Sequence, residues 1–259
     1  MPDRRHLLIL GGTAEARMLA AEAVARFGDV LRVTTSLAGR TSKAAALAGE
    51  WRRGGFGGVE GLARYLHAAS IDFVIDATHP FAARISAAAQ EACVSLGLPV
   101  LRVARAAWRP QPGDRWIEVA EAAEAAAILP RLGRRVFLTI GHRDLNSFAN
   151  LDGVYFLVRL VERPAGVLPL PPHDLILGRG PFTLEAERRI MERYAIDVLV
   201  AKASGGPATA AKLDAARSLG LPVVLLRRPP AERGACVERI EDAAQWIAQR
   251  LAKAEEVLS

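Results

Sequence analysis

The sequence has few cysteines, no long hydrophobic run and no block of like charges. Cys93 and Cys236 are its two cysteines, and neither lies in a metal-binding spacing, so we expect two ordinary thiols, a reducing cytoplasm and no metal site. No apolar run reaches the roughly 18 residues that a membrane-spanning helix needs. Residues 1–6 lead directly into a short apolar strand and lack the features of a signal peptide. These absences predict a cytoplasmic protein with no membrane partner.

Aromatic residues are also scarce, with four Trp, three Tyr and eight Phe in 259 residues. The net charge of +6 and a pI near 9.9 predict an acidic partner. However, the arginines are dispersed, whereas a nucleic-acid-binding surface normally shows a basic stripe. A polyanionic small molecule is therefore favoured over nucleic acid. Half of the residues are hydrophobic, which is enough for one large domain or two small ones.

The most informative stretch is the first turn of the chain. Residues 7–10 are apolar and precede a glycine pair, which is typical of a buried parallel strand. The pattern that follows predicts a helix capped by Thr13, so the turn resembles an anion site at a helix N-terminus. Gly11 and Ala16 fit the dinucleotide fingerprint, and Thr13 replaces its middle glycine. We expect Gly11, Gly12 and the Thr13 hydroxyl to bind a phosphate; the alternative is an ordinary strand–helix turn.

The predicted second strand, residues 30–36, indicates which cofactor the turn would bind. Its end lies about 20 residues past the glycine turn, where NAD enzymes carry a carboxylate for the ribose 2′-hydroxyl. This chain has no carboxylate there, and has instead Thr34 and Ser36 followed by Arg40. Hydroxyls and a cation suit a 2′-phosphate, so these three residues predict NADPH. The alternative is a polar strand end with a solvated arginine.

Another buried strand is predicted at residues 71–77, and it ends in Thr78-His79-Pro80. Polar groups at the carboxyl end of a parallel strand face the ligand crevice, so we expect Thr78 and His79 to contact the cofactor. The ordinary pKa of histidine, near 6.5, also makes His79 a candidate catalytic acid; the alternative is a structural or solvated histidine. Pro80 suits the first turn of the next helix, predicted over residues 81–96.

Two short segments recur later in the chain and predict two lobes. Residues 71–75 (IDFVI) resemble residues 196–200 (IDVLV), and residues 96–100 (LGLPV) recur as residues 219–223. We therefore expect an α/β protein with two Rossmann-like lobes, each built on a parallel sheet, and a cofactor cleft between them. The lobes are predicted at 1–105 and 118–259, joined by a Pro- and Trp-containing linker at 106–117. Coincidence is the alternative, since LGLP-type joins are common.

The second lobe has polar strand ends of its own. Arg143 follows a strand and Arg179 precedes a helix predicted at 184–194, so both are candidates to clamp substrate carboxylates; the alternative is solvated surface arginine. Lys202 ends another strand and is the second candidate catalytic acid, provided that burial or a nearby cation lowers its pKa. The following turn predicts a second anion site, formed by Ser204, Gly205 and Gly206.

Five motifs in this order cover nearly the whole chain. They are LGGT at 10–13, DATHPFA at 76–82, GPF at 180–182, KASGG at 202–206, and LPV at 221–223 ahead of Arg228-Pro229. Together they resemble the precorrin-6A reductase family. The resemblance implies that NADPH reduces one ring double bond of precorrin-6A, or of its cobalt form, to give precorrin-6B in cobalamin biosynthesis. It also implies a polycarboxylate tetrapyrrole substrate, bound with help from Phe182 and Lys202, and no metal, because the nicotinamide supplies the electrons.

Two alternatives remain open at this stage. One is a nucleotide-sensing α/β module without chemistry, and the other is a different two-lobed tetrapyrrole enzyme, a synthase or a methyltransferase. A reductase would consume NADPH when given precorrin-6A, a sensor would not, and a methyltransferase would bind S-adenosylmethionine. The proton needed beside the transferred hydride has three candidate sources, which are His79, Lys202 and water. The sequence does not indicate an oligomeric state.

Overall fold

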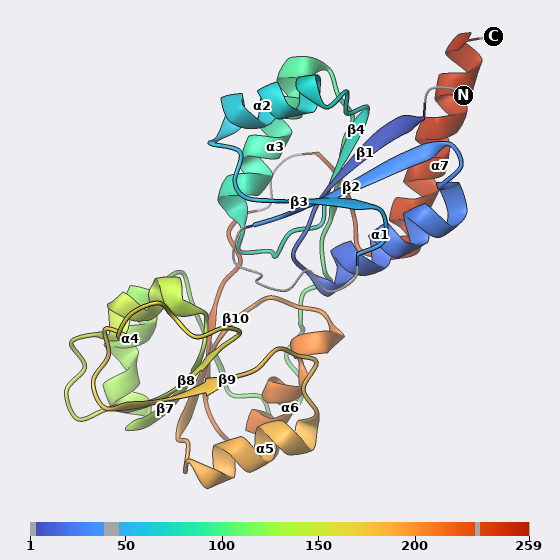
Figure 1. The fold of residues 1–259 in the computed structure, drawn as a ribbon. Coiled ribbons are helices and arrows are strands. Elements are labelled where there is room, and N and C mark those ends of the chain that lie inside the picture. The colour runs from blue at the N-terminus through green and yellow to red at the C-terminus, as the bar shows by residue number, and fades with distance from the viewer. Residues whose placement is uncertain (1–3, 39–46, 231–233, 259) are drawn as a thin grey trace. The chain divides into compact units, whose positions relative to one another are not determined.

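The computed structural model describes residues 4–38, 47–230 and 234–258, with side chains described up to residue 252. The chain forms two compact units, one made of Met1–Arg105 with Pro229–Ser259 and the other of Ala106–Arg228 (Figure 1). The predicted extent of the second lobe, 118–259, is therefore wrong at its C-terminal end. The reason is that β12 (Ala235–Val237) pairs with β5 (Val100–Val103), and α7 (Ile240–Leu258) packs against α1 (Ala14–Phe27).

The first unit is a six-stranded sheet in the order β12-β5-β4-β1-β2-β3, and all of its strand pairs are parallel. Its remaining elements are β1 (Arg5–Leu10), β2 (Leu31–Leu37), β3 (Glu50–Arg53), β4 (Phe73–Asp76), α2 (Val59–Ala68) and α3 (Ala83–Leu96). The helix after β4 begins at Ala83, so the prediction that Pro80 lies in its first turn is wrong.

Strand β1 shows why this sheet is covered on both faces. Successive side chains of a strand point to opposite faces. Leu7 and Ile9 pack with α1 and α7, whereas Leu8 and Leu10 pack with α2 and α3. Figure 1 shows these two helix pairs on opposite sides of the sheet. The continuous apolar run at the start of the sequence is the consequence of burial on both sides.

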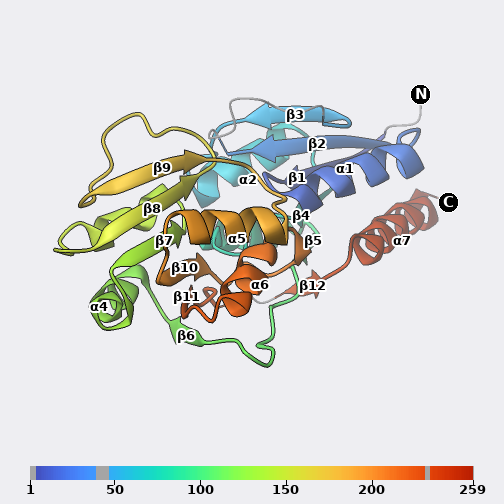
Figure 2. The ribbon, with the colours of Figure 1, turned by 90° about the horizontal axis from the view of Figure 1, so that it is seen from below.

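The second unit repeats this arrangement with the order β6-β11-β10-β7-β8-β9, again all parallel (Figure 2). Its strands are β6 (Trp116–Val119), β7 (Arg135–Thr139), β8 (Tyr155–Leu160), β9 (His173–Leu177), β10 (Val198–Lys202) and β11 (Val223–Leu226). Its helices are α4 (Ala122–Leu132), α5 (Leu184–Arg193), α6 (Ala211–Ser218) and two 3₁₀ turns, η1 (His142–Phe148) and η2 (Pro207–Thr209).

The two sheets have equivalent strand orders, which confirms the predicted pair of Rossmann-like units. The repeated segments at 71–75 and 196–200 contribute to β4 and β10, which occupy equivalent places in the two strand orders, beside β1 and β7 respectively. The sixth strand differs, since β12 comes from the end of the chain and β6 from the start of the second unit. In the described part of the chain, no helix is long and apolar enough to cross a bilayer.

Candidate functional site

The glycine turn after β1 combines one crowded and one open position. The Gly11 N–H donates to the Ser36 carbonyl at 2.9 Å, and a Cβ on Gly11 would lie 2.9 Å from Thr35 Cγ2, so this position must be glycine. Gly12 has φ +106°, and nothing lies within 4 Å of where its Cβ would be. A glycine with positive φ and open space above it lets another molecule approach the backbone closely.

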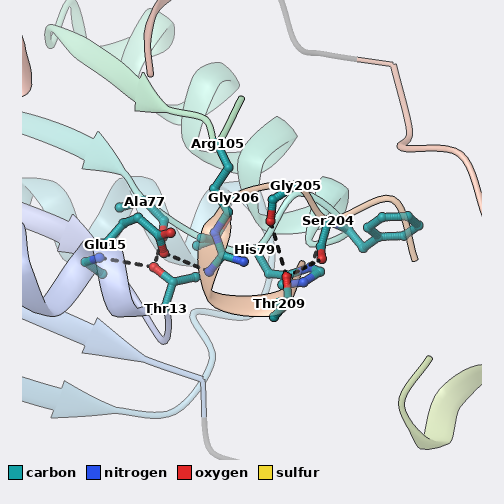
Figure 3. A network of polar contacts seen from close by, with 12 residues as sticks. Thr13, Glu15, Ala77, His79, Arg105, Ser204, Gly205, Gly206 and Thr209 are labelled. Carbon is teal, nitrogen blue, oxygen red and sulfur yellow. Dashed lines mark hydrogen bonds and ion pairs between the residues drawn. The ribbon is translucent and has the colours of Figure 1, made fainter. Parts of the chain in front are cut away.

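Thr13 holds this turn against the neighbouring strand (Figure 3). Its hydroxyl accepts from the Ala16 N–H at 3.1 Å, as the predicted helix cap does, and donates to the Ala77 carbonyl at 2.7 Å. Its one proton is used by Ala77 in this structure, so donation of this hydroxyl to a phosphate stays a prediction. Thr13 fixes the first turn of α1, whose leading N–H groups have no acceptor within the helix and suit an anion.

The first turn of α1 also carries a carboxylate, Glu15. Its side chain is paired with Arg105 at 2.7 Å, and the two side chains are 21% and 12% exposed (Figure 3). An unpaired carboxylate here would repel a bound phosphate. Arg105 offsets that charge, so the helix N-terminus stays compatible with an anionic ligand.

The residues predicted to bind a 2′-phosphate are not equivalent in the structure. Ser36 pairs with Leu10, the last residue of β1, whereas Thr34 pairs with Leu8, two residues further inside the sheet. The Thr34 hydroxyl contacts His6 Nε2 at 2.8 Å and donates to Glu50 at 3.3 Å. Thr34 is therefore an internal hydrogen-bonding residue, and burial lowers the pKa of His6 beside it. Arg40 lies outside the described residues.

At the end of β4, the backbone N–H and the hydroxyl of Thr78 both donate to Asp76 Oδ1, at 3.0 and 2.6 Å. His79 follows and is partly exposed, and its Nδ1 accepts from the Phe81 N–H at 3.2 Å. This bond places the proton of a neutral imidazole on Nε2. The local fold thus fixes the ring of His79, and Asp76 is the buried group that shapes the turn.

In the second unit, Lys202 Nζ lies 2.6 Å from Asp144 Oδ2, and their side chains are 21% and 32% exposed. Lys202 ends β10, and Asp144 lies in η1 directly after β7, the neighbouring strand. Parallel strands bring their carboxyl ends to one edge of a sheet, which explains the pairing. Sequence analysis identified Lys202 and missed Asp144, although the GHRD segment that contains it follows a predicted strand.

The Ser204-Gly205-Gly206 turn is tied into its own unit. The N–H groups of Ser204 and Gly206 donate to the Lys202 and Ala106 carbonyls, at 2.7 and 3.2 Å, and the Gly205 carbonyl accepts from the Thr209 hydroxyl at 3.3 Å (Figure 3). Two of the three backbone donors that the predicted anion site required are therefore used internally. An anion at this turn would depend on the Gly205 N–H and on side chains.

The two candidate arginine clamps and Phe182 lie at the same edge of the second sheet. Arg143 is exposed in η1, and Arg179 follows β9 with its side chain 46% exposed, 3.8 Å from Glu162. Phe182 lies against Arg159, whose guanidinium carbon is 4.0 Å from the ring centroid. The exposed guanidinium groups of Arg143 and Arg179 suit carboxylates. The Phe182 ring instead packs on the buried guanidinium of Arg159.

That cation belongs to a buried charged cluster that sequence analysis missed. Arg159 and Glu187 form an ion pair of 2.8 Å with side chains 8% and 1% exposed. Lys212 is also buried, and burial and the Arg159 charge lower its pKa to about 8, against a raising effect of Glu187. In the sequence, Glu187 is recognisable only as an acidic residue in the first turn of a helix. Its partner Arg159 is on β8, and the periodicity of a helix does not show which strand the helix packs on.

A family model, curated relatives and a solved structure each match this chain over nearly its full length. A family model described as "Precorrin-6x reductase CbiJ/CobK" matches residues 6–248. The precorrin-6A reductase of Rhodococcus erythropolis is 47% identical over 245 residues, which are 93% of this chain and 96% of that protein. The cobalt-precorrin-6A reductase of Priestia megaterium is 28% identical over 253 residues, 93% of this chain and 97% of its own. A solved structure described as "CobK precorrin-6A reductase" has a TM-score of 0.89 and 42% identity, covering 95% of this chain and 97% of its own.

Proposed function

The chain belongs to the precorrin-6x reductase family, and we propose that it performs the family's reduction with NADPH bound at the glycine turn of the first unit. It is an oxidoreductase of cobalamin biosynthesis whose substrate is a tetrapyrrole precursor. Membership favours this function over the sensor and the methyltransferase considered above. The cofactor and the residues that serve it are our proposal.

The observation that carries the cofactor proposal is the open Gly12 beside the crowded Gly11. Gly11 allows β1 and β2 to approach closely, and Gly12 exposes its backbone with nothing within 4 Å of its Cβ position. Thr13 caps α1 from a buried position, and Arg105 offsets Glu15. This combination fits a dinucleotide pyrophosphate at a helix N-terminus.

We assign the other roles as follows. Ser36 lies at the ribose end of the cofactor, and Thr78 and His79 contact it from the end of β4. A nicotinamide bound there would supply the hydride, which the family resemblance implies goes to C19 of the macrocycle while C18 takes a proton. In the second unit, Arg143, Arg179 and Lys202 bind carboxylates of the substrate, and Phe182 presents an apolar surface to the ring. A water delivers the proton, with His79 and Lys202 as positioning groups.

We further propose that the substrate is metal-free precorrin-6A. Five relatives at 41–47% identity are named precorrin-6A reductase, whereas the relatives named cobalt-precorrin-6A reductase are 26–31% identical. Turnover of precorrin-6A and of its cobalt form, followed by NADPH absorbance, tests the assignment. Faster reduction of the cobalt form would overturn it.

The experiment that tests the cofactor site is calorimetry on Gly12→Val. A branched side chain at φ +106° would fill the open space over the turn, and we expect NADPH binding to be lost. Gly97→Val is the matched control, because Gly97 has φ +64°, is equally open and lies at the end of α3. Undiminished NADPH binding by folded Gly12→Val would place the site elsewhere.

A further inference from the structure

We propose that Arg52 on β3 recognises the 2′-phosphate of the cofactor and thereby makes the protein selective for NADPH over NADH. This inference rests on the proposed function, since it concerns the ribose end of the same bound molecule. The sequence assigned this role to Arg40, whereas Arg52 lies on a different strand and was not considered.

Arg52 lies next to Ser36 at the end of β2. Its Nη1 donates to Ser36 Oγ at 2.8 Å, and Ser36 is its register partner across β2 and β3. The carbonyl of the same Ser36 accepts from the Gly11 N–H. The guanidinium is therefore linked through one residue to the glycine turn. A dinucleotide that lies on that turn extends its ribose toward the end of β2, where Arg52 is placed.

The guanidinium of Arg52 is held in place by backbone carbonyls and aromatic rings. Its Nη1 and Nη2 donate to the Gly54 and Gly55 carbonyls at 3.1 and 3.4 Å. Its central carbon lies 4.0 Å from the Phe56 ring centroid and 4.8 Å from that of Tyr65. Stacking and hydrogen bonding fix the plane of the group before any ligand arrives, which lowers the entropy cost of binding.

Arg52 also differs from its neighbour Arg32 in how its charge is compensated. Arg32, on the neighbouring strand, is neutralised by a two-point ion pair with Glu50. Within the described residues, the partners of Arg52 are hydroxyl and carbonyl oxygens and aromatic rings, and no carboxylate forms an ion pair with it. Three of its five N–H groups are used by these partners, which leaves donors for an anion.

Ser36 completes the site. Its hydroxyl accepts the hydrogen bond from Arg52, so its own proton is directed elsewhere and can be donated to a phosphate oxygen. A guanidinium with an adjacent hydroxyl donor is a suitable arrangement for a phosphate monoester. A ribose 2′-hydroxyl, as in NADH, carries no charge for Arg52 to recognise.

Calorimetry with four ligands tests the inference: NADPH, NADH, adenosine 2′,5′-bisphosphate and 5′-AMP. We expect Arg52→Ala to weaken NADPH and the bisphosphate about ten- to a hundredfold, as for loss of a charge-assisted hydrogen bond, and to leave NADH and 5′-AMP within about twofold. Arg52→Lys should retain more NADPH affinity than Arg52→Ala. Arg32→Ala is the matched control, because it removes the same charge from the same sheet, and it should change none of the four affinities.

The outcomes separate this inference from the proposed function. Equal losses for NADPH and NADH in Arg52→Ala, with a lowered melting temperature, would mean that Arg52 only supports the 54–55 turn, and the inference would be overturned. It would also fail if Arg52→Ala left NADPH unchanged while Gly12→Val abolished binding, and the proposed function would then stand. Failure of the native protein to bind NADPH would overturn both. If Arg52→Ala does not fold, Arg52→Gln provides the same comparison, because it keeps most of the side chain and removes the charge.

Discussion

Replacement of Glu187 by glutamine should destabilise the second unit more than any exposed charge change on the same helix. Glu187 is 1% exposed and pairs with Arg159 at 2.8 Å, and Lys212 is buried close enough for both charges to affect its pKa. Glu187→Gln preserves the shape of the side chain and removes the only anion that these three residues contain. Two buried cations would then remain without their counter-charge.

The expected magnitude follows from the burial of the pair. Removal of one partner of a buried ion pair typically costs about 3 to 5 kcal/mol, because the other charge stays desolvated. For a unit of this size, that loss lowers the melting temperature by roughly 10 to 20 °C. The change should also release the Phe182 ring, which lies on the Arg159 guanidinium, so substrate binding should weaken together with stability.

Urea unfolding at pH 7, followed by circular dichroism, measures the effect. The matched control is Glu192→Gln, because Glu192 is on the same helix and pairs with Arg188, with side chains 46% and 55% exposed. This exposed pair should contribute less than about 1 kcal/mol. The triple variant Arg159→Met, Glu187→Leu and Lys212→Met should recover much of the loss, since it leaves no unpaired charge in the cluster. Equal stability of Glu187→Gln and Glu192→Gln would refute the reasoning.

Three further predictions concern individual side chains. Burial lowers the pKa of Lys212 to about 8 in the folded chain, and this pKa is higher in the unfolded chain. The unfolded state therefore binds more protons between those two values, so the free energy of unfolding should rise with pH above 8. Urea unfolding at pH 7 and 9.5 should show a smaller rise for Lys212→Met than for the native protein, and an equal rise contradicts the assignment. If water delivers the proton, His79→Ala and Lys202→Ala should each lose less than about a thousandfold in kcat at saturating ligands, and a larger loss assigns the proton to that residue. Arg179→Lys should raise KM for the tetrapyrrole, because the forked contact is lost, and an unchanged KM would make Arg179 a solvated surface residue.

Sequence patterns predicted the central strands β1, β4 and β10 well because each is a short apolar run followed by polar residues. The segments 71–75 and 196–200 contribute to equivalent strands in two sheets of the same order, as their similarity predicted. The same patterns could not place the end of the chain. Helix α7 is amphipathic, and an apolar stripe shows that a helix packs without showing which unit it packs against. Ala243 and Ile247 in fact complete the core around α1.

The site was predicted less completely, because its details depend on register. Thr34 and Ser36 lie on the same face of β2, and only the pairing with Leu8 and Leu10 shows that Ser36 reaches the strand end. The approach of Arg52 to Ser36 follows from the same register between β2 and β3. No local pattern in the sequence carries that information, since the two residues are on separate strands whose order the sequence leaves open.

Lys202 shows how such a missing contact changes a chemical role. The sequence allowed it to act as an acid only if burial or a nearby cation favoured its loss of a proton. The structure shows a carboxylate beside it, because Asp144 Oδ2 lies 2.6 Å from Lys202 Nζ. A lysine held by an anion at a sheet edge is a fixed positive charge, suited to orienting a substrate carboxylate. The pairing follows directly from the adjacency of β7 and β10, so strand order, rather than residue type, is what supports our proposal that Lys202 is a positioning group.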